Sequence, residues 1–290
     1  MNFDIKKYEE ELTWDKPIEY IPVKMKNKLK LLVNKYDKSK NKSEKSMLAE
    51  QINELMNCEI LIYPVKMGDY FKFYSNIDIL LIEKNKISNA KIISMSYLDF
   101  IMIIIKNDLE KGQVYKHKLL TLFSLCFHIE VSDIGYGEYK PDHYHFYIKD
   151  IEFTKEDFNV LKKIICYQNM PNYDDRYVSP DVQEQIDDIN KLSNIDTDVL
   201  LEKQIVSLMA STHYTLDQIH DMTIRKFVLT LEKVDKKLHY QIYKLASFIP
   251  FVKLKEDIPH WIYGKDKDKY SNVLLNGDGF KGKIKSALKG

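Results

Sequence analysis

The chain has 290 residues, 44% of them hydrophobic, and its 44 basic residues nearly balance 43 acidic residues, for a formal net charge of +1. This hydrophobic fraction supports a folded protein with one large core or two modest ones and excludes an intrinsically disordered chain. The total charge provides no uniform attraction to nucleic acid, so we expect no specific nucleic-acid partner.

The sequence shows no pattern typical of a signal peptide or of a membrane-spanning helix. The first fourteen residues, MNFDIKKYEEELTW, are too charged for a signal peptide. The most apolar run, YLDFIMIIIKNDL, is much shorter than the roughly 20 residues needed to cross a bilayer. Cys58, Cys126 and Cys166 form no CxxC pair and have apolar neighbours, which predicts buried, reduced thiols. We therefore expect a soluble protein in a reducing compartment, with no membrane partner.

The first two blocks of the chain differ in character. Residues 1–57 read as a charged helical extension, with helices expected at 24–37 and 44–57 around a polar linker. Residues 58–170 predict a mixed α/β domain. We expect strands at CEILIYPVKM, AKIISM and DHYHFYIKDIEF, and a helix at DYFKFYSNIDILLIEKN. We expect a helix that runs into a strand at HKLLTLFSLCFHIEV. We expect a hairpin turn or loop at GYGEYKPD.

A helix is expected to begin near the end of this domain, at Thr154. Thr154, followed by Glu156 and Asp157, predicts an N-cap with acidic residues in the first turn. The helix should bury Phe158, Leu161, Ile164 and Ile165 and stop before Pro171. Residues 171–197 are then expected to form a polar linker or helix.

Residues 198–264 predict an all-helical, partner-binding domain. A short helix carries Leu201, Ile205 and Leu208, a capping box begins at Thr215, and Thr223 can cap a long helix. Residues 265–290 are rich in lysine and glycine and are expected to form a mobile basic tail. The fold class expected for the whole chain is α+β, with a mixed amino-terminal domain followed by an all-α carboxy-terminal domain.

The long helix has an apolar stripe in steps of three and four, formed by Phe227, Leu231, Val234, Leu238, Ile242 and Leu245. Packing against the two shorter helices would bury it, although these helices offer little area for so long a stripe. Tyr240, Tyr243, Phe248, Phe251 and Trp261 lie off the stripe or beyond its end. Large aromatic side chains with polar tips dominate many protein interfaces, so a second, partner-binding face is the alternative.

Residues for catalysis or metal binding are sparse. His143 and His145 would share one face of a strand, but no third ligand stands at a recognised spacing. Asp174 and Asp175 lie beside Arg176 in a polar connection, where they fit the role of turn residues. No nucleotide-binding, zinc-protease or serine-hydrolase motif occurs. We therefore expect no catalytic residue, no metal and no cofactor, and keep a metal-dependent enzyme built on these four histidine and aspartate residues as the weakest alternative.

Four segments together resemble a tail-gene-associated protein family of tailed bacteriophages and prophages. They are YPVKMGDYFKF, LLIEKNKISNAKIISMSYLDFI, IICYQN and the run from Met222 to Ile262. The last run is also similar to helical phage tail assembly chaperones, which have a T-x-x-[DEQ]-I helix, an F-x-x-x-[LI]-x-x-[IV] helix and a terminal His-Trp. The matching residues here are Thr215, Gln218, Ile219, Phe227, Leu231, Val234, His260 and Trp261. Those chaperones are shorter and lack the mixed amino-terminal domain.

The resemblance implies a non-catalytic tail assembly protein in the cytoplasm of the infected host. Its partners would be the tape-measure protein and, with it, the tail tube subunits. The partner-binding residues expected on this reading are Phe227, Tyr240, Tyr243, Phe248 and Trp261. The alternative implied by the same resemblance is a structural component of the virion, at the tail, baseplate or connector.

Overall fold

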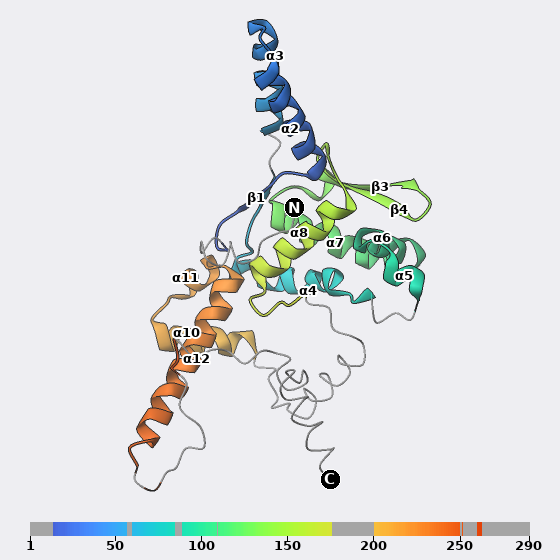
Figure 1. Ribbon diagram of the computed structural model, residues 1–290. Coiled ribbons are helices and arrows are strands. Elements are labelled where there is room, and N and C mark those ends of the chain that lie inside the picture. Colours follow the sequence, from blue (N-terminus) through green and yellow to red (C-terminus); the bar gives the residue numbers. More distant parts are fainter. Residues whose placement is uncertain are drawn as a thin grey trace, which may run out of the picture. The chain divides into compact units, whose positions relative to one another are not determined.

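A computed structural model describes residues 14–56, 60–84, 89–108, 110–175, 200–249, 251 and 260–262. It confirms the α+β class, with small antiparallel sheets in the amino-terminal part and helices in the carboxy-terminal part (Figure 1). The chain forms two compact units. Unit 1 contains Met1–Asp174 and Asp217–Val228, and unit 2 contains Asp175–Leu216 and Leu229–Gly290.

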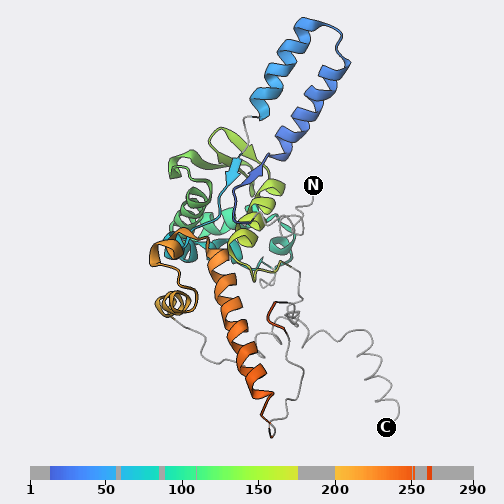
Figure 2. The same cartoon turned by 90° about the vertical axis from the view of Figure 1, so that its left-hand side faces the viewer.

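Unit 1 begins with a helical hairpin between two paired strands. Strand β1 (Ile18–Tyr20) runs antiparallel to β2 (Ile60–Ile62). Between them, α2 (Val23–Lys38) and α3 (Lys42–Met56) lie side by side and bury Leu32 and Leu48 (Figure 2). Both helices extend into the predicted polar linker, so only residues 39–41 connect them. The early start of α3 is explained by a hydrogen bond of 3.0 Å, which Asn41 Oδ1 accepts from Ser43 N.

The rest of the mixed part alternates helices with one hairpin sheet. In chain order its elements are η1 (Met67–Asp69), α4 (Tyr70–Leu81), α5 (Ala90–Ser94), α6 (Tyr97–Asn107), α7 (Gly112–Phe127), η3 (Val131–Asp133), β3 (Ile134–Lys140), β4 (His143–Ile148), β5 (Ile151–Phe153) and α8 (Lys155–Asn169). The three strands form one antiparallel sheet in the order β3-β4-β5. The predicted helix over α4 is confirmed. The segment DHYHFYIKDIEF, expected as one strand, forms two antiparallel strands, β4 and β5, joined by a turn at Lys149 and Asp150.

Three local predictions are wrong. The segment HKLLTLFSLCFHIEV does not run into a strand, because α7 ends at Phe127 and η3 begins at Val131. The segment AKIISM is helix α5 and not a strand, because the Asn89 side chain accepts hydrogen bonds from Lys91 N and Ile92 N and so caps a helix. Most of GYGEYKPD is strand β3 and not a turn, and only Pro141 and Asp142 remain between β3 and β4.

An aromatic cluster forms the centre of unit 1. Phe123 of α7 packs against Phe146 of β4 and Phe158 of α8, with ring centroids 4.8 and 5.7 Å apart. All three rings are fully buried. Because these residues come from three elements, the cluster fixes the sheet against α7 and α8.

The predicted cap of α8 is confirmed and has a further role. Thr154 and Asp157 form a capping box at the start of α8. The Asp157 carboxylate is completely buried and also accepts hydrogen bonds from Tyr20 Oη at 2.6 Å and Val23 N at 2.8 Å. One side chain therefore caps α8 and holds the start of α2.

The second segment of unit 1 contains α11 (Leu216–Asp221), except for its first residue, and the first residues of α12 (Ile224–Ala246). Met67 N donates to Met222 O and Ile224 N donates to Val65 O, both at 2.9 Å. Arg225 lies over the Trp14 ring and donates to Tyr167 O at 2.5 Å. The division into units thus differs from the boundary expected at residue 198, because the start of α12 pairs with the chain near Val65.

Unit 2 contains α10 (Leu201–Thr212), which buries Leu208, and the remainder of α12. The expected linker over 176–199 and the tail over 265–290 lie outside the described residues. In the part of the chain that the structure describes, no helix combines the length and apolar character that a membrane span needs.

Candidate partner-binding surface

Helix α12 begins as predicted and is long. Lys226 N donates to Thr223 Oγ1 at 3.2 Å, which caps the first turn, and the helix continues for 23 residues to Ala246. Its apolar residues recur in steps of three and four, so they share one face of the helix. The exposure of this face rises along the helix, from 1% at Phe227 to 49% at Leu238, 61% at Ile242 and 69% at Leu245.

We call Leu238, Ile242 and Leu245 the distal stripe. Phe248, Ile249 and Phe251, which follow the helix, are exposed as well. The prediction that packing buries the whole stripe is wrong for this half of α12. The sequence feature that indicates this exposure is the difference in helix length. Helix α12 has 23 residues, whereas α10 has 12 and α11 has 6. Folded monomers rarely expose a contiguous apolar patch unless it binds a partner or a membrane.

The five residues expected to bind a partner do not form one surface. Phe227 is buried in the core of unit 1 and offers no side-chain surface. Tyr240 and Trp261 are both half-buried and lie on either side of His260, with ring centroids 5.1 and 6.3 Å from it. Tyr243 and Phe248 are exposed. The role of these residues in partner binding stays a prediction. The predicted set did not include the residues of the distal stripe.

Most charges around the distal stripe are positive, and the acidic residue beside it is Asp235, which lies 3.3 Å from His239. Between residues 236 and 249 the sequence has three lysines and one histidine but no acidic residue. Lys237 lies 5.9 Å from the Trp261 ring and Lys244 lies 6.0 Å from the Phe248 ring. The surface is therefore an apolar stripe with basic flanks, which favours an apolar partner with acidic or neutral edges.

The two histidines considered as metal ligands have separate carboxylate partners. His143 Nδ1 lies 3.4 Å from Asp99 Oδ2, whereas His145 Nδ1 contacts Glu152. Glu152 also accepts from Lys24 at 2.6 Å. Across the described ranges, no group of three or more histidine, cysteine, aspartate or glutamate residues could hold a metal ion. The Arg176 of the Asp174–Asp175 pair lies outside these ranges, so its geometry is not described.

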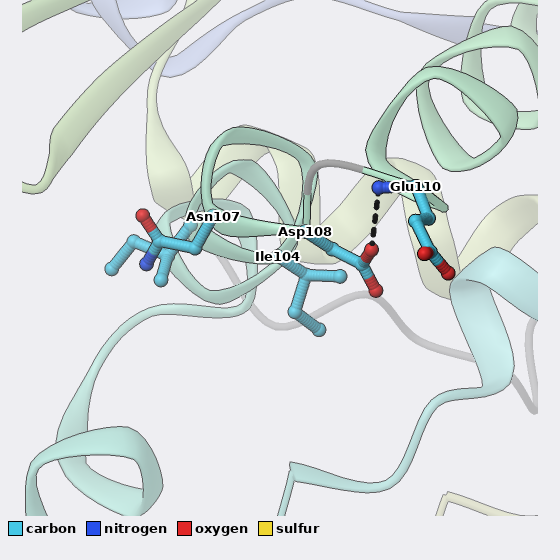
Figure 3. Close-up of a pocket in the computed structure, with 5 residues that line it drawn as sticks. Ile104, Asn107, Asp108 and Glu110 are labelled. Carbon is cyan, nitrogen blue, oxygen red and sulfur yellow. Dashed lines mark hydrogen bonds between the residues drawn. The ribbon is translucent and has the colours of Figure 1, made fainter.

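A shallow hollow of about 530 Å³ lies at the corner between α6 and α7. It is lined by Ile103, Ile104, Asn107, Asp108 and Glu110 (Figure 3). The Asp108 carboxylate accepts hydrogen bonds from Glu110 N at 3.1 Å and Lys111 N at 2.7 Å, so it closes the turn into α7. This carboxylate therefore has a structural role in the turn.

Comparison with protein families gives a match over the carboxy-terminal part of the chain. Residues 190–264 match the family described as the YomV second domain. This range includes α10, α11 and α12, and therefore the distal stripe. YomV is associated with phages and prophages. No curated protein and no solved structure matches the chain significantly.

Proposed function

We propose that the chain is a non-catalytic assembly protein of a phage tail and that the distal stripe binds an apolar helix of the tape-measure protein. The exposure of Leu238, Ile242 and Leu245 on one face of α12 carries this proposal. A long apolar helix needs its stripe covered until tube subunits surround it. An amphipathic helix that presents an unfilled apolar face can provide this cover.

Two further observations support the proposal. The match to the YomV second domain covers the segment that contains the distal stripe, and it links this segment to phages. The helix start that precedes the stripe is held firmly, because Thr223, Ile224 and Arg225 all bond within unit 1. A preformed helix loses less conformational entropy on binding than an unstructured segment does.

The test is co-expression of the tape-measure protein with the full chain. The wild-type chain should keep the tape-measure protein in the supernatant, and the Ile242→Ser/Leu245→Ser variant should leave it in the pellet. Equal recovery with both chains contradicts the proposal. Mass spectrometry of purified particles then distinguishes the two roles, because an assembly chaperone should be absent from them and a structural tail component should be present in stoichiometric amount.

A further inference from the structure

The positive charge of the chain is concentrated in the α2–α3 hairpin. Residues 23–46 contain nine lysines and two acidic residues, which gives this segment a net charge of +7. Because the whole chain carries +1, the remaining residues together carry −6. The balanced total therefore hides a strongly basic segment, and this segment is folded.

Several of these lysines form a line on α2. Lys24, Lys28, Lys35 and Lys38 follow one another at spacings of four, seven and three residues, and all four are exposed. At 3.6 residues per turn they lie along one face, over a length of about 21 Å. Leu32, four residues after Lys28, lies beside this line and is buried where α2 packs on α3. We call this line the lysine face.

Acidic residues neutralise little of the lysine face. Lys24 pairs with Glu152 at 2.6 Å, but Lys28, Lys35 and Lys38 have no ion pair within the described residues. Glu44, one of the two acidic residues of the segment, accepts a hydrogen bond from Ser39 Oγ at 2.7 Å. Like charges three or four residues apart destabilise a helix, so an anionic ligand would relieve this repulsion.

We propose that the α2–α3 hairpin binds the phosphate backbone of double-stranded nucleic acid, without reading the base sequence. A duplex carries one negative charge per roughly 1.7 Å of its axis, so about twelve phosphate charges lie along a stretch of duplex as long as the lysine face. Lysine contacts a phosphate as a point charge and needs no fixed geometry for it. This inference concerns a surface outside the distal stripe and does not rest on the proposed tail function.

Other anionic partners fit the hairpin less well. Single strands are bound by stacking their bases on aromatic side chains, but the one aromatic residue of α2 and α3 is Tyr36, and Lys45 lies 5.0 Å from its ring. An interfacial membrane helix needs a free apolar face opposite its lysines. In α2 that face carries Lys26 and Asp37 beside the exposed Val33, so it is not a continuous apolar face.

The experiment measures binding of the full chain to two fluorescent duplexes of unrelated sequence, each of about 30 base pairs, between roughly 50 and 200 mM salt. The test variant is Lys28→Gln/Lys35→Gln/Lys38→Gln. The matched control is Lys72→Gln/Lys111→Gln/Lys140→Gln, which removes the same charge from exposed positions elsewhere in unit 1. Glutamine and lysine have similar helix propensities, so circular dichroism should show an unchanged helix content in both variants.

The wild-type chain should bind both duplexes equally. The hairpin variant should bind at least about tenfold more weakly, and the slope of log affinity against log salt should become shallower by about 2 to 3, because each phosphate contact contributes about 0.9. The control should stay within about twofold of the wild type. The inference is overturned if the wild type does not bind at the lowest salt, if the control loses as much affinity as the hairpin variant, or if polyglutamate or anionic phospholipid vesicles bind the hairpin more tightly than the duplexes do.

Discussion

Phe227 and Leu238 lie on the same face of α12, about three turns apart, but Phe227 is 1% exposed and Leu238 is 49% exposed. Both belong to one unbroken apolar pattern in the sequence. The difference arises because the start of α12 pairs with the chain at Val65 and Met67, and this pairing ends after the first turn. The same pattern therefore serves a core at one end of the helix and a free surface at the other.

Substitutions at these two positions should differ in their effect on stability. Phe227→Ala should lower the free energy of unfolding by about 3–5 kcal/mol, since it leaves a cavity in a packed core. Leu238→Ala should lower it by less than about 1 kcal/mol, because half of the side chain is already in water. Urea unfolding of both variants checks this. Equal losses would mean that the distal part of α12 is packed as firmly as its start.

The Asp157 carboxylate should be one of the most sensitive positions of unit 1. Asp157→Asn removes a buried charge that accepts from Tyr20, Val23 and Thr154, and we expect a loss of about 2–4 kcal/mol in the free energy of unfolding. Glu156→Gln is the control, because Glu156 is the exposed neighbour in the same helical turn. If chemical denaturation shows the same midpoint for both variants, Asp157 does not hold the start of α2.

Local signals explain which elements could be predicted from the sequence. Helix α8 was predictable because its cap, its acidic first turn and Pro171 all lie within a short stretch. Helix α5 was missed because two adjacent isoleucines suggested a strand, while the deciding residue, Asn89, stands just before the run. The exposure of the distal stripe depends on how far the pairing with Val65 extends along α12. This contact joins residues that are distant in the sequence, so hydrophobic periodicity cannot predict it.

The two described cysteines should be chemically inert in the folded protein. Cys126 and Cys166 are buried and form no disulfide. Burial raises the pKa of the Cys126 thiol well above its ordinary value, and the neighbouring Cys166 raises it further, so little thiolate exists at neutral pH. In a Cys58→Ser background, we expect no reaction with an aromatic disulfide reagent at pH 8 until denaturant is added. Rapid labelling of either thiol in the native protein would contradict the burial.

Glu138 offers a test of the electrostatics of the β3–β4 hairpin. The hydrogen bond from Lys106, at 2.9 Å, lowers the pKa of Glu138 below its ordinary value of 4.5. A lowered carboxyl pKa contributes stability above the ordinary value, and this contribution is lost as the pH falls through the folded-state pKa. Lys106→Gln should therefore raise the pKa of Glu138 toward 4.5 in a carboxyl-resolved NMR titration, and Lys72→Gln should leave it unchanged. An unshifted pKa in the Lys106 variant would mean that the pair does not form in solution.

The most direct test of the distal stripe is the affinity of the purified full chain for the tape-measure protein. The Ile242→Ser/Leu245→Ser variant is compared with Leu31→Ser/Met47→Ser, which removes two apolar side chains of similar exposure from α2 and α3. Truncation of a central interface residue commonly weakens binding by about 2 kcal/mol or more, so the stripe variant should bind at least about thirtyfold more weakly while its thermal melt stays close to that of the wild type. The control pair should bind as the wild type does. Unchanged affinity in the stripe variant, or an equal loss in the control, would contradict the assignment of this surface to the partner.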